Sequence, residues 1–296
     1  MAFDRYVHGR TQDGKSVGLS FLVRLLNEYG LHGVFFVEPL FSGRFGIGPL
    51  EEIIGIIREG GQEVQLHLHT EWANEAHERL LPHVTEKRQH LRDFSAVDQE
   101  TLIVAASRLI KTAGGGRPTA FRAGSFALNR DTLTVLPRCG IRIDSSYNAT
   151  MLGATSGVAP GRLLTDVSLI GEVSEYPISV FVDGLGRQRH AQIGASSFEE
   201  LTQALWAALE GGQRAFVIVF HNFELLNQAK TGRDAIVVRR FERLCRFLAE
   251  NRESFRTRGF LASNLPEGTG TGPELRVTRA ATGRRILEQL TRRLAA

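Results

Sequence analysis

The sequence has little cysteine and no long apolar run. Its 296 residues include only two cysteines, Cys139 and Cys245, so no disulfide framework is predicted and a reducing compartment is expected. No apolar stretch is long enough to span a bilayer, so no integral membrane segment is predicted. The first residues, Met-Ala-Phe-Asp-Arg-Tyr, do not follow the basic-then-apolar pattern of a signal peptide. We therefore expect a cytoplasmic protein.

The charge balance is mildly basic. The chain has 36 Lys and Arg residues against 32 Asp and Glu residues, a formal net charge of +4 and a pI of about 9.4. This balance permits an anionic partner without requiring one, and no pattern indicates nucleic-acid binding or an oligomeric state. The apolar and charged fractions, 42% and 23%, are ordinary for a globular protein with a sizeable core.

Short apolar segments alternate with segments of helical periodicity, which predicts a parallel α/β barrel or an open sheet. Ser197 and Asn129 are predicted to cap helices, Ser197 as the start of a Ser-x-x-Glu capping box. Residues 1–15 and 148–171 lack a periodic pattern and are expected to be loops. The expected strands are 34–37, 64–69, 120–122, 141–143, 173–182 with a break at Pro177, 216–220 (buried on both faces) and 256–261.

Three regions are expected along the chain. Residues 1–262 form the α/β domain, and residues 263–274, rich in Gly, Thr and Pro, form a flexible linker. Residues 275–296 form a basic amphipathic helix. Its pattern would suit a membrane surface or a partner helix, but a solvated or self-packed terminal helix is the favoured interpretation.

The most informative segment is residues 64–72, Val-Gln-Leu-His-Leu-His-Thr-Glu-Trp. Alternate side chains of a strand share a face, so His67 and His69 point the same way and Glu71 follows them. Imidazole nitrogens and carboxylate oxygens are ligands that borderline metals such as zinc accept. The segment therefore predicts that these three side chains converge on one cation. The alternative is a pair of histidines at a surface strand end.

Other polar residues stand at the predicted carboxyl ends of strands, where sites in parallel α/β folds gather. Asp144 is expected to cap the following segment, with substrate binding or the role of a catalytic carboxylate as alternatives. His77, His83 and His90 lie in a polar stretch and are expected to be solvated. The candidates at the strand ends are Glu38, His67, His69, Arg122, Asp144, Glu175 and His221.

Three segments, in this order, resemble motifs of the polysaccharide deacetylase (NodB-homology) family. Residues 67–71, His-Leu-His-Thr-Glu, are similar to its His-Ser/Thr-x-x-His metal motif. Residues 121–126, Phe-Arg-Ala-Gly-Ser-Phe, are similar to its Arg-x-Pro/Gly-x-Tyr/Phe loop, and residues 217–221, Val-Ile-Val-Phe-His, to its Leu-x-x-His strand end. The resemblance spans about residues 16–262. It implies a distorted (β/α)7 barrel that removes acyl groups from N-acylated sugars or glycans with one divalent metal, usually zinc.

The resemblance also implies roles for individual residues. It makes His67 the first metal-binding histidine and places Glu71 where the family has its second, with His69 as an alternative ligand on the same strand face. Arg122 would orient a catalytic carboxylate, although from the residues alone it is equally a structural ion-pair partner. His221 would be the general acid that protonates the leaving amine. Its alternative role is a polar residue that closes a buried strand.

One motif of the family is not evident. The family's first strand ends in an acidic pair that supplies the general base and a metal ligand, whereas this chain starts with Met-Ala-Phe-Asp4 and no apolar strand. We therefore expect a barrel that lacks its first strand, with Asp4 as the candidate base, and either a start site placed too late or an inactive protein. An added upstream strand would be expected to raise stability and metal affinity, because the strand at 34–37 otherwise keeps an unpaired edge.

Two functions follow from this pattern. The first is a metal-dependent hydrolase of carbon–nitrogen, non-peptide amide bonds that acts on a polysaccharide or N-acyl sugar. The alternative is a catalytically inactive barrel of the same type that binds a glycan or a partner protein. Hydrolases of the amidohydrolase type also use a His-x-His pair, but there the pair follows the first strand, whereas here it follows two helices.

Overall fold

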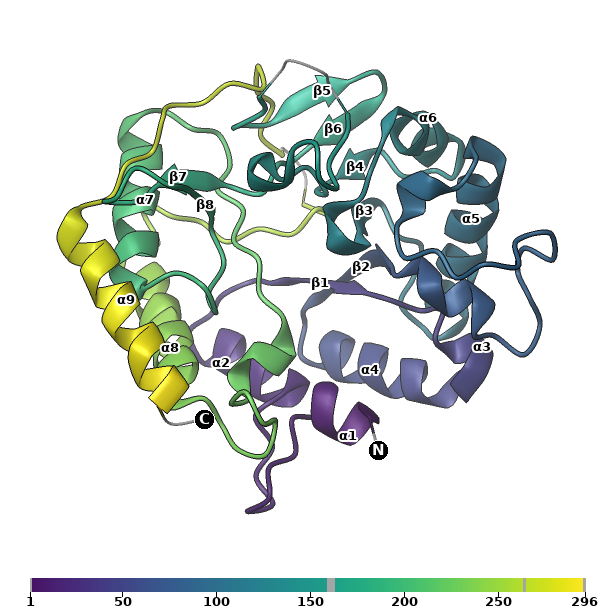
Figure 1. Cartoon of the computed structure of the whole chain (residues 1–296), viewed down its shortest axis with the longest axis horizontal. Coiled ribbons are helices and arrows are strands. Elements are labelled where there is room, and N and C mark those ends of the chain that lie inside the picture. The colour runs from purple at the N-terminus through teal and green to yellow at the C-terminus, as the bar shows by residue number, and fades with distance from the viewer. Residues whose placement is uncertain (1, 159–162, 263–264, 295–296) are drawn as a thin grey trace. The chain divides into compact units, whose positions relative to one another are not determined.

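The computed structural model of the chain describes residues 2–158, 163–262 and 265–294. The chain forms two compact units, whose elements are labelled in Figure 1. Unit 1 comprises residues 1–33, 179–258 and 272–296, and unit 2 comprises residues 34–178 and 259–271. None of the helices in the described part of the chain is both long and apolar enough to cross a membrane.

Unit 2 is organised around six strands: β1 (Val34–Val37), β2 (Glu63–Leu68), β3 (Ala120–Ala123), β4 (Ile143–Asp144), β5 (Ser168–Ile170) and β6 (Val173–Glu175). They form one sheet in the order β1-β2-β3-β4-β6-β5 (Figure 1). All neighbours are parallel except β5, which pairs antiparallel with β6 at one edge. The predicted α/β class is confirmed. Within the described residues, the sheet of unit 2 is open and β1 is its other edge.

Helices connect the parallel strands of unit 2: α3 (Ser42–Phe45), α4 (Gly48–Glu59), α5 (Ala96–Thr112) and α6 (Arg130–Arg138). Single-turn helices follow the strands or join longer elements: η1 (Thr70–Asn74), η2 (Leu91–Asp93), η3 (Gly124–Phe126) and η4 (Ala149–Met151). The apolar face of α4 is buried through residues spaced i, i+3, i+4 and i+7, namely Leu50, Ile53, Ile54 and Ile57. Asn129 caps α6 in a reciprocal capping box with Thr132, so the predicted cap is confirmed.

Unit 1 combines a two-stranded antiparallel sheet, β7 (Val180–Val182) and β8 (Gln188–His190), with helices. The helices are α1 (Ala2–Tyr6), α2 (Leu19–Glu28), α7 (Phe198–Glu210), η5 (Asn222–Leu225), α8 (Ala235–Glu250) and α9 (Arg279–Leu294). Ser197 and Glu200 form the predicted capping box at the start of α7, which is confirmed.

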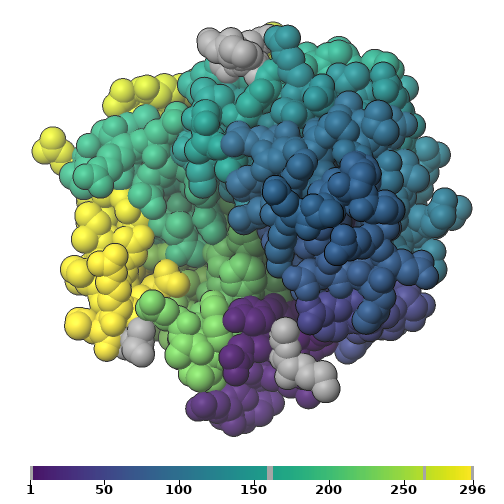
Figure 2. All heavy atoms as spheres, turned by 45° about the vertical axis from the view of Figure 1, so that its right-hand side comes forward, coloured from purple at the N-terminus to yellow at the C-terminus, as the bar shows by residue number. Residues whose placement is uncertain are grey.

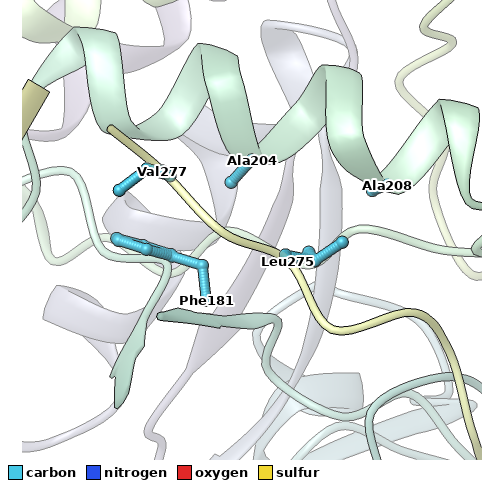
Figure 3. Packing of buried hydrophobic residues seen from close by; sticks show 5 residues of the cluster. All are labelled: Phe181, Ala204, Ala208, Leu275 and Val277. Carbon is cyan, nitrogen blue, oxygen red and sulfur yellow. The ribbon is translucent and has the colours of Figure 1, made fainter. Parts of the chain in front are cut away.

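A small core joins α7 to β7 and to the segment that leads into α9 (Figure 3). Phe181 of β7 packs with Leu275 and Val277 against Ala204 and Ala208 of α7, and all five side chains are buried. Because alanines leave room on this face of α7, the 275–277 segment lies close enough to bond with β7. The N–H of Val182 donates to the carbonyl of Leu275 at 2.7 Å, and the N–H of Val277 donates to Val182 at 3.1 Å.

The prediction of a strand at 216–220, buried on both faces, is wrong. Val219 is buried and forms an isolated bridge with Gln192, while its neighbours in the run are half-exposed. Backbone hydrogen bonds involve alternate residues, such as the N–H of Val219 to the carbonyl of Ala191 at 2.9 Å. The carbonyl of Val217 accepts from the N–H of Ser179 at 3.1 Å. A continuous apolar run does not distinguish a regular strand from an extended segment with such isolated bonds.

The prediction of a last strand at 256–261 is also wrong. The N–H groups of Phe260 and Leu261 donate to the two carboxylate oxygens of Glu63 at 2.9 and 3.1 Å. Glu63 is buried at the start of β2. A side-chain carboxylate therefore accepts from the donors that a strand ladder would use, and no periodicity in the segment reveals such a partner.

Two segments that were predicted to be loops contain regular secondary structure. Helix α1 lies within residues 1–15, and β5 lies within residues 148–171. The predicted strand at 173–182 divides at Pro177 into β6 and β7, which belong to different sheets. Residues 263–264 of the predicted linker lie outside the described residues, but Pro266 and Gly270 bond to Tyr176 and Val167 of unit 2.

Replacing Glu63 tests the contact that takes the place of the last strand. Glu63→Ala leaves two backbone N–H groups without their acceptor, and each such loss costs roughly 1–3 kcal/mol. We expect urea denaturation to show a lower free energy of unfolding by at least that amount. Glu59→Ala, on the exposed side of α4, is the control and should change it by only about 0.5 kcal/mol. Equal effects of the two variants would contradict this role of Glu63.

Candidate functional site

Five parallel strands of unit 2 end at the same edge of the sheet, and polar side chains lie at or just beyond each end. The pairing sets His67 on β2 opposite Arg122 on β3, and Asp144 on β4 opposite Glu175 on β6. Ligands of parallel α/β sheets bind outside the carboxyl ends of the strands. The residues at this edge are Glu38, His67, His69, Glu71, Arg122, Asp144 and Glu175.

His67 is held by a backbone carbonyl. Its Nδ1 lies 2.7 Å from the carbonyl oxygen of Arg122, and its side chain is half-buried. A carbonyl can only accept, so Nδ1 carries the proton of this bond, and Nε2 of the neutral ring carries the lone pair. A carbonyl that fixes one ring nitrogen is the usual arrangement for a histidine that binds a metal through the other.

His69 and Glu71 lie beside His67. The two imidazole ring centroids are 4.8 Å apart with an interplanar angle of 83°. Glu71 Oε1 is 3.3 Å from His69 Nδ1, whereas Glu71 Oε2 is buried with no hydrogen-bond partner in the described chain. Burial works to raise the pKa of Glu71, but the hydrogen bond from His69 and the charges of His69 and Lys87 lower it overall. Glu71 is therefore an ionised carboxylate with an unused oxygen.

The side chains of His67, His69 and Glu71 are of the types that bind a divalent metal, but they are not arranged to bind one together. Two imidazoles and a carboxylate oxygen without a partner are groups that zinc accepts. However, no three His, Cys, Asp or Glu side chains of the described residues are placed to hold a metal ion together. Glu71 bonds to His69 instead. The three residues predicted from sequence, His67, His69 and Glu71, thus lie together. For all three to bind one metal ion, the contact between His69 and Glu71 would have to change.

Glu38 follows β1 and lies close to the same group. Its two oxygens accept from the N–H groups of Leu40 and Phe41 at 2.9 and 3.2 Å. Burial raises the pKa of Glu38 to about 8, and the negative charge of Glu71 contributes to the increase. A carboxyl that exchanges its proton near neutral pH is suited to general acid–base chemistry.

Arg122 anchors the neighbouring part of the edge. Its guanidinium donates from Nε to the carbonyl and from a terminal nitrogen to the hydroxyl of Ser145, both at 2.8 Å. It also lies over the ring of Phe36 at 4.2 Å. Burial lowers the pKa of Arg122 to about 10, opposed by the charges of Asp144 and Glu175. The guanidinium thus links the end of β3 to the residue that follows β4 through hydrogen bonds to Ser145.

Asp144 and Glu175 form a fully buried carboxyl pair. Burial raises the pKa of Glu175 well above its ordinary range, and the adjacent charge of Asp144 raises it further. Asp144 is also raised by burial, but hydrogen bonds from Glu175 and Ser146 oppose that shift of its pKa. Glu175 therefore keeps the shared proton. Asp144 accepts from the hydroxyl and N–H of Ser146 at 2.6 and 3.2 Å, so it caps the following segment as predicted.

The loop after β3 has a strained backbone at the edge of the site. Ser125 and Phe126 both adopt left-handed φ angles, 55° and 58°. A Cβ on Gly124 would lie 2.5 Å from the Leu68 carbonyl and 3.0 Å from His69 Nδ1. Only glycine fits against the imidazole at this point, and backbone strain of this kind often accompanies functional sites.

Aromatic side chains extend the site from β1 and β2. Trp72, three residues after His69, makes edge contacts with Phe41 and Phe45 at centroid distances of 6.5 and 5.8 Å. Phe45 is 45% exposed, and the guanidinium of Arg44 lies 5.5 Å from its ring centroid. Of the three rings, Phe45 is thus exposed beside a cation, whereas Trp72 is half-buried and Phe41 is buried.

His221 lies in unit 1, at the start of η5. Its Nδ1 is 2.7 Å from Glu224 Oε1, which also accepts from Gln192 at 2.6 Å. The ring stacks on Phe223 at 5.1 Å, and the side chain is 51% exposed. Glu224 was not among the residues predicted from sequence. The only signal for it was the His-x-x-Glu spacing of a capping box, which gives no indication of function.

Asp4 also belongs to unit 1, within α1. Its described partner is Arg10, with Oδ1 3.4 Å from the guanidinium, and its side chain is 39% exposed. Thus His67, His69, Glu71 and Arg122 lie together in unit 2, while His221 and Asp4 belong to unit 1.

Solved structures of low sequence identity are similar to this chain, whereas no family model and no curated protein match it. A family 4 carbohydrate esterase from Streptomyces lividans has a TM-score of 0.48 at 14% identity, covering 87% of this chain and 94% of that one. A CE4 family pseudoenzyme from Bacillus anthracis scores 0.40 at 12% identity, covering 88% and 66%. A GH57-type branching enzyme from Pyrococcus horikoshii scores 0.48 at 11% identity, covering 90% and 71%. Similarity at this level assigns no activity and no catalytic residue.

The raised pKa of Glu38 predicts how stability depends on pH. Between about pH 4.5 and 8, the unfolded chain releases the proton that folded Glu38 retains, so rising pH favours unfolding. Glu38→Gln removes this contribution. We expect the Tm of the metal-free protein to fall with rising pH across this window, and the variant to fall less steeply. Glu51→Gln, an exposed carboxylate on α4, should leave the slope unchanged; parallel curves for all three proteins would contradict the assignment.

Proposed function

We propose that the chain is a metal-dependent hydrolase of amide bonds in N-acylated sugars or glycans. The observation that carries this proposal is the group around His69. The ring of His67 lies 4.8 Å away, and Glu71 keeps one buried oxygen without a hydrogen-bond partner among the described residues. His67, His69 and Glu71 are the proposed ligands, and zinc is the proposed metal. When bound, such a metal polarises an amide carbonyl and makes water more acidic.

The protein's own groups supply the proton transfers in this proposal. Glu38 is the proposed base, because its pKa of about 8 suits accepting a proton from water near neutral pH. His221 is the proposed acid for the leaving amine. Its Nδ1–H donates to Glu224, and the imidazolium form gives its Nε2 proton to the amine and becomes the neutral ring. Arg122 is a positioning residue, because its carbonyl orients His67. Asp4, the base suggested by the sequence, is the competing candidate.

A second candidate function is a catalytically inactive α/β domain that binds a glycan. The observation in its favour is the contact between Glu71 and His69, together with the lack of any three-ligand metal group in the described part of the chain. Such a protein would bind N-acetylated oligosaccharides equally well with and without metal, and it would release no acetate.

Metal binding is the first test. We expect isothermal titration to show zinc binding that weakens by more than about a hundredfold in His67→Ala and Glu71→Gln, because loss of even an outer partner of a metal ligand typically costs roughly 10–100-fold. His83→Ala, which removes a histidine that is 64% exposed and paired with Asp98, is the control and should bind normally. Equal zinc affinity in all four proteins would contradict the assigned ligands.

Measuring hydrolysis distinguishes between Glu38 and Asp4, the two candidates for the general base. With zinc present, acetate release from N-acetylglucosamine oligomers should fall by about 10²–10⁴-fold in Glu38→Gln and in His221→Ala, the usual size of general acid–base contributions. Asp4→Asn should retain most activity. The reverse order of Glu38 and Asp4 would make Asp4 the base. No acetate release by the unaltered chain, with intact glycan binding, would favour the second candidate function.

Trp72 should contribute to glycan binding under either function. Trp72→Ala removes the ring that borders both Phe41 and Phe45, and we expect affinity for N-acetylglucosamine oligomers to fall about tenfold, or roughly 1.4 kcal/mol. Zinc affinity should not change, since Trp72 is not a proposed ligand. Phe21→Ala, a half-exposed aromatic of α2 in unit 1, is the control. Unchanged glycan affinity in Trp72→Ala would place the binding surface elsewhere.

A further inference from the structure

Helix α9 is attached to unit 1 through its charged side. Arg285 is buried and bonds to Asp183 at 2.7 Å and to Glu200 at 3.0 Å. Further along the helix, Glu288 bonds to the buried Arg240 at 2.7 Å, and Arg292 bonds to Asp234 at 2.6 Å. The face of α9 that meets the rest of its unit therefore consists largely of ion pairs.

The apolar side of α9 faces outward. Its aliphatic residues occupy positions i, i+1, i+4 and i+8, which share one side of a helix. Their exposed fractions are 39% for Ile286, 57% for Leu287, 50% for Leu290 and 90% for Leu294. A helix at the surface of a globular protein normally turns such a stripe toward the core. Contiguous exposed apolar side chains of this kind mark an interaction surface.

Exposed arginines border this apolar stripe. Arg279 lies in line with the stripe at the start of the helix, Arg293 and Arg284 lie along its two sides, and all three are exposed. The one acidic residue of α9, Glu288, is already paired with Arg240 and Arg284. Beside the stripe, α8 and α9 form a groove of about 290 Å³, lined in part by Arg239, Arg243 and Leu287. Helix α9 runs alongside α8 and α7 at the surface of the unit (Figures 1 and 2).

We propose that α9 binds the surface of an anionic phospholipid bilayer. The four aliphatic side chains enter the boundary between head groups and acyl chains, and the bordering arginines contact lipid phosphates. Amphipathic helices with a basic border bind bilayers in this orientation, with affinity from both the apolar area and the anionic lipid. The helix lies in the plane of the interface and does not cross it, since it has 16 residues and many charges.

Charge favours this occupant over a second copy of the chain. A symmetric dimer through α9 would place the same patch against itself. The arginines that border the stripe would then face one another, and juxtaposed like charges disfavour association. An anionic surface instead complements all of them at once. The ion pairs of Arg285, Glu288 and Arg292 can stay in place during binding, because they lie on the opposite side of the helix.

Co-sedimentation of the full chain with lipid vesicles tests the proposal. We expect binding to vesicles that mix phosphatidylcholine with phosphatidylglycerol, little binding to phosphatidylcholine alone, and weaker binding at high salt. The double variant Leu287→Ser/Leu290→Ser and the triple variant Arg279→Gln/Arg284→Gln/Arg293→Gln should each lower affinity at least about tenfold. Their Tm should stay close to that of the unaltered chain, because the altered side chains are exposed and Glu288, which loses Arg284, keeps its pair with Arg240.

Two control variants test whether lipid binding depends on this surface of α9 or only on the protein's total charge and exposed apolar area. Leu209→Ser replaces a leucine on α7 that is 43% exposed. Arg24→Gln/Arg108→Gln/Arg130→Gln lowers the net charge equally at exposed sites on other helices. Both controls should bind as the unaltered chain does. Lack of binding to either vesicle, or equal losses in variants and controls, would overturn the proposal. A concentration-dependent dimer that Leu287→Ser/Leu290→Ser abolishes would instead assign the stripe to a second copy.

Discussion

Arg122 connects four strands of unit 2, and the candidate site depends on it. Its carbonyl on β3 accepts from His67 of β2, and its guanidinium donates to the carbonyl and hydroxyl of Ser145, just after β4. The same hydroxyl donates to the carbonyl of Tyr176, just after β6. The strands β3, β4 and β6 are only two to four residues long, so ladder bonds alone fix their ends weakly. The Arg122 carbonyl, its guanidinium and the Ser145 hydroxyl together form a chain of hydrogen bonds that links these ends.

The carboxyl groups around this cation divide into two kinds by their access to solvent. Asp144 and Glu175 are fully buried and share a proton, and they accept from the N–H groups of Ser146 and Tyr147, just after β4. Their hydrogen bonds are made to buried groups of the same unit, and these bonds stabilise the strand ends. Glu71 and His69 are 26% and 34% exposed, so a ligand can reach them. The part of the edge that a ligand can reach is therefore the end of β2, and Glu38, just after β1, has a raised pKa.

The sequence was sufficient for features that follow from short-range periodicity. The strand at 34–37, the caps at Asn129 and Ser197 and the shared face of His67 and His69 depend on local pattern alone. Features decided by a distant partner could not be predicted. The N–H groups of residues 260 and 261 bond to Glu63, almost 200 positions away, and the raised pKa of Glu38 depends on burial. The His221–Glu224 contact spans three residues, but its importance depends on Gln192, which joins the same carboxylate.

The attachment of α9 illustrates how buried ion pairs can serve specificity more than stability. Desolvation offsets much of the attraction within a buried pair, so Arg285 with Asp183 and Glu200 is weak evidence for a large stabilising contribution. These pairs do require one rotation of the helix about its axis, because any other rotation would leave a buried carboxylate without its cation. That rotation turns Leu287 and Leu290 outward. Burying the leucines instead would satisfy the hydrophobic effect and leave Asp183, Glu200 and Asp234 unpaired. The orientation of α9 is thus decided by the high cost of unpaired buried charge, and the exposed apolar stripe is its direct consequence.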